Sequence, residues 1–377
     1  MKNTQKKARL KEAAIVGAIA LTFILLVPGI VPDARLNQLG RFLALAIAAL
    51  GIDLIWGYTG LLSLGHGVFF ALGGYAFAMH LKLQIPPNSS IKVPEFMSGF
   101  RVELPWFWQP FHSFPFSVFA VVAIPAILGA VLGYLVFRNR IRGVYFSILT
   151  QAATIVFFNF FNSQQLINGT NGLTQLTLFG ASVNSRDTEY IFYLLTVLFL
   201  AATYALCRWL TCGRFGRLLV AIRDDEVRLR FSGYNPTGYK VLVFAISAGL
   251  AGVSGALYTV QTGIISPTAM NIAFSIEMVI WVAVGGRATL SGAILGAFLV
   301  NFAKTLLSEK FPEVWLFFQG ALFLIVVTVL PDGIVGWLQN KDFEHIRRLF
   351  KKPKYASTYP SLEQDPEVQR EKEELEH

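Results

Sequence analysis

One carboxylate stands alone in a long apolar part of the chain. Between Val241 and Gly286 the only Asp, Glu, Lys, Arg or His is Glu277, and Trp281 follows it four residues later, on the same face of a helix. A carboxylate among apolar residues at membrane depth is costly and marks a function by default. Glu277 could accept hydrogen bonds from a solute, and Trp281 could stack on a planar one. The alternative is structural: Glu277 pairs with Arg287 or caps a broken helix.

Gln151, Thr154 and Asn159 lie along the apolar run 143–161. Offsets of three and five residues place Gln151 and Thr154 on one side of a helix and Asn159 on another. All three are candidates for lining a solute path, because amide and hydroxyl groups both donate and accept hydrogen bonds. The alternative is hydrogen bonding between helices, which such residues provide within membranes.

Asp53 and His66 flank the tight turn at residues 56–60. A carboxylate and a histidine near the ends of two helices could relay protons. That reading would make the chain a proton-coupled secondary transporter, using Asp53, His66 or Glu277. A structural hydrogen bond at the helix ends is the alternative.

The polar connection 211–239 has a pattern typical of a short helix. Asp224, Asp225 and Glu226 suit the positive end of a helix dipole, and Arg228 and Arg230 suit the negative end. Gly233 can adopt the left-handed conformation that ends a helix. The pattern predicts about two helical turns between two spanning helices, able to transmit force from a soluble motor; a solvated, positively charged loop is the alternative. The candidate contacts for that motor are Arg214, Arg217, Arg223, Asp224, Asp225, Glu226, Arg228 and Gly233.

Motifs for catalysis or cofactor binding are missing from the sequence. It contains no Gly-Lys pair, which excludes a GxxxxGK[ST] phosphate-binding loop, and it contains no HExxH or GxSxG motif. Cys207 and Cys212 match neither a zinc site nor a CxxC motif. We therefore expect no metal, no cofactor and no enzyme activity, so that any ATP driving the protein is hydrolysed by another subunit.

The elements that carry these residues are apolar enough to lie in a bilayer. The 377 residues are 54% hydrophobic and 15% charged, whereas soluble domains have roughly 25% charged residues. The runs 13–31, 115–137 and 143–161 contain no Asp, Glu, Lys, Arg or His, and each approaches the roughly 20 residues that cross a bilayer as a helix. The predicted fold class is an all-α, polytopic integral membrane protein.

About ten transmembrane helices are predicted, with both termini cytoplasmic. This topology places most of the 32 Lys and Arg residues on the cytoplasmic side. The net charge of +9 therefore reflects the positive-inside bias rather than nucleic-acid binding. The helices are predicted near 13–31, 39–56, 61–81, 115–137, 143–161, 190–210, 240–262, 274–286, 289–307 and 314–338.

The predicted organisation has three parts: a cytoplasmic N-terminal segment at 1–12, a transmembrane domain at 13–340 and a cytoplasmic tail at 341–377. The domain includes a periplasmic loop near 82–114 and the cytoplasmic coupling loop near 211–239. Segment 274–286 is short and either spans or is re-entrant, and broken helices of this kind tend to line cavities.

Several segments together resemble the permease subunits of ABC importers for branched-chain amino acids and amides, over roughly residues 40–338. They read GLLSLGHGVFFALGGY at 60–75, RGVYFSILT at 142–150, NGTNGL at 168–173 and GRLLVAIRDDE at 216–226, with Tyr239, Lys240 and residues 248–258 after them. The resemblance implies an inner-membrane permease with a second homologous permease, two ATP-binding subunits and a periplasmic substrate-binding protein. The loop departs from the common coupling motif, because no Glu-Ala-Ala triplet precedes Gly233.

Within that family the chain looks most similar to the larger permease of the urea importer. The segments that carry this likeness are FSGYNP at 231–236 and SIEMVIWVAVGGRATL at 275–290. The likeness implies import of urea or related short amides from periplasm to cytoplasm. Import of branched-chain amino acids is the alternative.

Overall fold

The computed structural model describes residues 22–23, 32–85, 93–99, 103–141, 143–174, 176–178, 181–182, 186–311, 314, 317–321, 324, 328 and 333–340. The predicted segments 1–12 and 341–377, nearly all of the helix predicted at 13–31 and much of the one at 314–338 lie outside these residues.

The described part is almost entirely helical. Its long helices are α3 (Asp33–Ile52), α4 (His66–Lys82), α5 (Phe114–Arg138), α6 (Val144–Ser163), α7 (Arg186–Cys212), α8 (Arg214–Phe231), α9 (Pro236–Thr262), α10 (Ile272–Gly285) and α11 (Leu290–Lys310), with the short α13 (Gly333–Asn340) after them. A π-helical turn, η1 (Asp53–Gly57), continues α3. Short 3₁₀ turns lie at η2 (Glu95–Met97), η3 (Gln109–His112), η4 (Gln165–Ile167), η5 (Gly169–Asn171) and η6 (Pro267–Met270), and β1 (Thr177–Leu178) pairs antiparallel with β2 (Ala181–Ser182), Thr177 opposite Ser182.

Six of the described helices are long and apolar enough to cross a membrane: α3 with η1, α5, α6, α7, α9 and α11. α4 and α10 are shorter, at 17 and 14 residues. The all-helical, multi-span architecture is therefore confirmed, while the count of ten stays a prediction. One predicted boundary is wrong: the helix expected at 61–81 begins only at His66, because Gly60 has a positive φ of 73° that ends the preceding turn.

α9 is the central helix of the bundle and packs against α3, α4 and α5. Glycines bring α9 and α4 into backbone contact: a Cβ at Gly73 would overlap Gly252, and one at Gly255 would overlap the carbonyl of Phe70. Small residues allow such close helix packing within lipid. α10 and α11 meet in the same way, through Gly285 and its neighbours on α11.

The helices differ in how much apolar surface they expose. α5 and α6 leave large side chains uncovered, such as Phe119 at 67% and Val156 at 66% exposure. This is the surface expected against lipid or another membrane subunit. α10 is covered on all sides from Glu277 to Gly285, so it is an internal element rather than a lipid-facing one.

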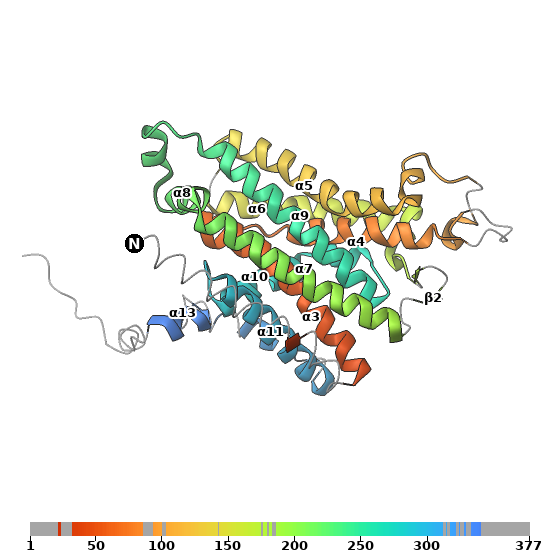
Figure 1. Ribbon diagram of the computed structural model, residues 1–377. Helices are drawn as coiled ribbons and strands as arrows, with labels where there is room; N and C mark the ends of the chain where they lie inside the picture. The colour runs from red at the N-terminus through yellow and green to blue at the C-terminus, as the bar shows by residue number, and fades with distance from the viewer. Residues whose placement is uncertain are drawn as a thin grey trace, which may run out of the picture. The chain divides into compact units, whose positions relative to one another are not determined.

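The connections gather at two ends of the bundle. α8 lies at one end, between the close of α7 and the start of α9, while the connection from α4 to α5 extends from the other end (Figure 1). A β-bridge between Leu173 and Ile265 ties together the segments that follow α6 and α9. The end that carries α8 is the one that the charge distribution predicts to be cytoplasmic.

Candidate functional site

The predicted coupling loop contains a helix much longer than two turns. α8 has 18 residues, and an extended backbone at Asp225 (φ −158°, ψ 93°) divides it into two helical pieces. The second piece is the one that the sequence predicts. The first piece was missed, although its buried Leu219 and Ile222 stand three residues apart on one face.

Asp225 caps the second helical piece. Its Oδ1 accepts hydrogen bonds from the backbone amides of Val227 and Arg228, each at 3.0 Å. These bonds, first of all the one from Arg228, hold the pKa of the Asp225 carboxyl below its usual value. Gly233 follows the helix with φ +84°, in the left-handed region expected for it. The helix thus begins and ends where the charge and glycine pattern placed its ends.

A buried ionic cluster fixes α8 to α9. Glu226 is 8% exposed and accepts hydrogen bonds from Lys240 Nζ at 2.5 Å and from Arg230 Nη2 at 2.8 Å. Lys240, the fifth residue of α9, is itself buried and lies 5.6 Å from the ring centre of Phe137 on α5. Glu226 therefore bonds α8 to α9, and Lys240 extends this contact to α5. In the sequence, only the family resemblance points to Lys240.

Arg223 joins α8 to the end of α3. Its Nη1 donates to the backbone carbonyl of Gly57 at 2.8 Å, while its Nε donates to Asp224 at 3.2 Å. The aliphatic stem of Arg223 lies against Gly60, where a Cβ would approach it to 3.0 Å. Arg223 is thus a second candidate residue, besides Glu226, that connects α8 to the membrane-spanning bundle.

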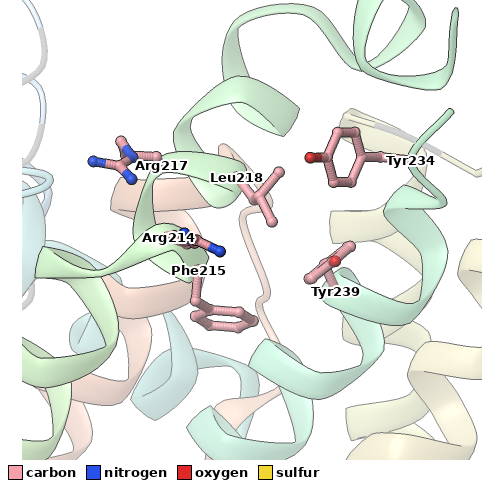
Figure 2. Close-up of a pocket in the computed structure, with 6 residues that line it drawn as sticks. All are labelled: Arg214, Phe215, Arg217, Leu218, Tyr234 and Tyr239. Atoms are coloured by element: carbon pink, nitrogen blue, oxygen red, sulfur yellow. The ribbon is translucent and has the colours of Figure 1, made fainter. Parts of the chain in front are cut away.

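Arg214 and Arg217 lie on the outer side of α8 and line a hollow of about 580 Å³. The rest of its lining is apolar and aromatic: Phe215, Leu218, Tyr234 and Tyr239. Figure 2 shows Leu218 pointing toward the two tyrosines and Arg217 extending to the other side. Nearby surface positions are also apolar, with Phe231 at 89% and Tyr234 at 47% exposure. Exposed aromatics beside arginines are typical of an interaction surface.

The end of α3 also contacts the turn between α10 and α11. Asp53 is fully buried, and its Oδ1 accepts a hydrogen bond from the amide of Ala288 at 2.7 Å. Ala288 has a positive φ of 58°, unusual for a residue with a side chain. The guanidinium of Arg287 lies 5.2 Å from the ring centre of Trp56. Through these contacts the residues next to Gly57 are tied to both α8 and the α10–α11 turn.

Glu277 has a different partner from the one considered in the sequence. Lys304 on α11 donates to both carboxylate oxygens, at 2.9 and 2.8 Å, whereas Arg287 lies on Trp56. Pairing with Arg287 is therefore wrong, because α11 runs back beside α10 and brings Lys304 level with Glu277. Glu277 is 5% exposed, and Lys304 retains a side-chain exposure of 38%.

Trp281 lies on the same internal helix and is fully buried. Its ring packs edge-on against Phe274, with 6.1 Å between ring centres. Its Nε1 has no acceptor among the described residues. Burial on all sides means that a solute could stack on Trp281 only after neighbouring helices move.

The polar residues of α6 separate into two kinds. Thr154 is fully buried and donates to Thr150 at 2.9 Å and weakly to the carbonyl of Leu64 at 3.4 Å. Gln151 is half-buried and Asn159 is exposed on another side of the helix. The offsets therefore predicted correctly that Asn159 faces elsewhere, and Thr154 follows the structural alternative.

His66 and Asp53 do not bond to each other. The His66 Nε2 pairs with Ser247 Oγ on α9 at 2.7 Å, while Asp53 bonds to Ala288. These contacts favour the structural alternative over a direct relay between the two. Cys207 and Cys212 form no disulfide within the described part of the chain; the first is buried and the second half-buried.

Comparisons with known proteins agree with this architecture. A family model described as "Branched-chain amino acid transport system / permease component" matches residues 34–327. The high-affinity branched-chain amino acid transport system permease protein LivM of Salmonella typhimurium is 26% identical, and the match covers 77% of this chain and 67% of that protein. LivM of Escherichia coli K12 matches with the same identity and coverage. LivH of Salmonella typhimurium is 24% identical over 77% of this chain and 91% of that protein. No solved structure matches.

Proposed function

Because the chain belongs to the family of permease components of branched-chain amino acid transport systems, we propose that it is the membrane-spanning subunit of an ATP-driven importer that carries branched-chain amino acids. It is a multi-pass protein of the bacterial inner membrane. The observation that carries the proposal is the anchoring of α8: this surface helix is tied to the bundle by Arg223 and by the buried Glu226 cluster.

α8 has the features needed to pass a movement into the membrane. A partner that pushes on its exposed face moves a helix whose inner face is bonded to α9 and to the end of α3. Arg223 then acts on Gly57, and Asp53, four residues earlier, acts on the α10–α11 turn through Ala288. We therefore assign force transfer to α8, with Arg214, Arg217 and the surrounding aromatic residues as the docking surface.

The relatives support branched-chain amino acids as the solute, since the LivM and LivH proteins are named for that transport. A second candidate is urea or a related short amide. It is favoured by the segments at 231–236 and 275–290, which resemble the urea importer's permease. Urea is neutral and planar, whereas an amino acid carries two charges through the membrane. The two solutes therefore make different demands on the path.

The proposed partners are a second homologous permease, two ATP-binding subunits and a periplasmic substrate-binding protein. The lack of a phosphate-binding loop in the sequence assigns ATP hydrolysis to the partner subunits. The apolar surfaces of α5 and α6 offer room for a second membrane subunit beside lipid.

Uptake measurements test both parts of this proposal. In a strain lacking this chain, labelled leucine and labelled urea are measured separately, with and without the restored gene. Restored leucine uptake supports the main proposal, and restored urea uptake alone supports the second candidate. Uptake of either solute that persists when the partner ATPase cannot hydrolyse ATP would contradict an ATP-driven importer.

A further inference from the structure

The chain from Gly60 to Gly65, between η1 and α4, is not helical although half of its residues are buried in the bundle. Gly60 ends the preceding turn, and α4 begins only at His66. Residues 62 and 64 are half-buried, whereas Leu61, Ser63 and Gly65 are buried. Non-helical backbone at membrane depth is tolerated where it is buried in protein or lines a cavity.

Hydroxyl groups of α6 hold one side of this segment. Ser147 Oγ donates to the carbonyl of Leu62 at 2.6 Å, and Thr150 Oγ1 accepts from the amide of Leu64 at 3.0 Å. Ser147 and Thr150 lie in the first two turns of α6, so the segment runs inside the bundle beside the start of that helix. Side-chain hydroxyls thus replace part of the backbone hydrogen bonding that a helix would supply.

Three consecutive amides of the segment have no acceptor among the described residues: those of Leu61, Leu62 and Ser63. Ser63 is fully buried and Leu61 is 5% exposed. Buried backbone amides are almost always paired, because an unpaired one is costly. Consecutive unpaired amides form a donor array that suits a carbonyl or carboxylate oxygen.

An acceptor follows directly after these donors. Ser247 Oγ gives its one proton to the carbonyl of Gly51 at 2.6 Å, so the His66 Nε2 must be the donor in its 2.7 Å bond to that oxygen. The tautomer leaves His66 Nδ1 as a buried acceptor, and it has no partner among the described residues. The segment and the first residue of α4 therefore offer donors and an acceptor without a net charge.

We propose that this segment is the solute-recognising element, a conclusion that rests on the proposed transport function. The amides of Leu61, Leu62 and Ser63 donate to a carbonyl or carboxylate oxygen of the solute, and His66 Nδ1 accepts from its N–H group. An amino acid and a short amide both carry these groups. The chemistry that the site recognises is therefore a carbonyl or carboxylate oxygen together with a nearby N–H group. The Arg223 side chain lies against Gly60, the residue before Leu61. The proposed site therefore begins directly beside the residue that connects α8 to the bundle.

Replacing the Leu62 amide by an ester tests the proposal without changing a side chain. Suppression of a stop codon with the α-hydroxy analogue of leucine removes the N–H of Leu62 alone. The matched control is the same replacement at Leu64, whose N–H bonds to Thr150 instead. In the assembled importer in vesicles, we expect the KM for the transported solute to rise about three- to tenfold for Leu62. We expect the Leu64 ester to lower the amount of protein and leave KM unchanged.

A second measurement keeps the test valid if an ester variant does not assemble. Leu62→Cys is introduced after Cys207 and Cys212 are replaced by Ala, and Leu149→Cys on the exposed face of α6 is the control. We expect the transported solute, leucine or urea, to slow thiol labelling several-fold at position 62 and not at 149.

The outcomes separate the site from the function. Unchanged KM in the Leu62 ester, or equal labelling at position 62 with and without a solute that is demonstrably transported, overturns the site alone. If the unmodified importer carries neither leucine nor urea, the proposed function fails and the site fails with it.

Discussion

The guanidinium of Arg223 donates to the backbone carbonyl of Gly57 across 2.8 Å. This bond links a helix outside the bundle to the π-helical turn that ends α3. Its position is informative because Asp53, in the same turn, bonds to the α10–α11 connection. The turn is therefore bonded both to α8, the proposed docking helix, and to the connection that follows the internal helix α10.

Arg223→Ala is expected to lower solute uptake about tenfold, since it removes the hydrogen bond from the charged guanidinium to the Gly57 carbonyl, besides the exposed contact with Asp224. The amount of inserted protein should stay near normal, because the side chain is 38% exposed and contributes little to folding. Arg228→Ala is the control, as the Arg228 side chain pairs with Asp225 alone among the described residues and lies on the surface of α8. Uptake at the wild-type level in Arg223→Ala would remove Arg223 from the force-transfer route.

Lys240→Met should strongly destabilise the protein, because it leaves the buried carboxylate of Glu226 without its closest partner. Breaking a buried pair from one side costs about 3–5 kcal/mol. The double variant Glu226→Gln with Lys240→Met should be clearly more stable than Lys240→Met alone. Thermal unfolding midpoints in detergent measure this difference, and additive losses would show that the two residues are not coupled.

Lys304→Met is expected to reduce the amount of folded protein, because Glu277 would then be a buried, unpaired charge. Combining it with Glu277→Gln should restore the protein level, and uptake by that double variant then tests the path role. Lys310→Met, at the exposed end of the same helix, is the matched control. Normal uptake in the double variant would mean that the pair only holds α10 against α11.

Asp53→Asn should retain uptake, since an amide oxygen can still accept from the backbone of Ala288. Asp53→Leu leaves that amide unpaired, at a cost of about 1–3 kcal/mol, and should impair both stability and transport. The two variants are compared by protein level and by uptake per folded molecule. Equal loss in both would instead assign the role to the charge of Asp53.

Asp225→Ala should loosen the second half of α8, whereas Asp225→Asn keeps the cap, because both Asp and Asn are good N-cap residues. Trypsin cleavage after Arg228 in inside-out vesicles reports the difference, since this side chain is 84% exposed. Faster cleavage is expected only for the Ala variant. The pKa of the Asp225 carboxyl is lowered in the folded protein. The stability that the ionised cap contributes is therefore present at neutral pH and is lost as the pH falls through that lowered pKa.

Local patterns in the sequence predicted most of the helices within a few residues. Apolar runs fixed α5, α6, α9 and α11, because a spanning helix is defined by the bilayer that it must cross. The pattern failed at residues 61–65, which are as apolar as a helix but are not helical. There the decisive feature is the positive φ of Gly60 together with the hydroxyls of α6, which are distant in the sequence.

The candidate site was less predictable than the fold for the same reason. Asp225 and Gly233 act within their own helix, so their spacing was enough. Glu277 pairs with a residue on the next helix, and only the packing of α10 against α11 identifies Lys304. Thr154 was a candidate for the path, and its structural role depends on a segment about ninety residues earlier in the chain.

The glycine contacts between helices also decide which parts of the molecule can move independently. α4 and α9 touch through backbone atoms at Gly73 and Gly255, and interlocked backbones cannot slide or rotate past each other without separating. α10 and α11 are interlocked in the same way at Gly285. Each pair therefore behaves as one rigid body during a transport cycle. Alternating access would then be a change of angle between these two helix pairs.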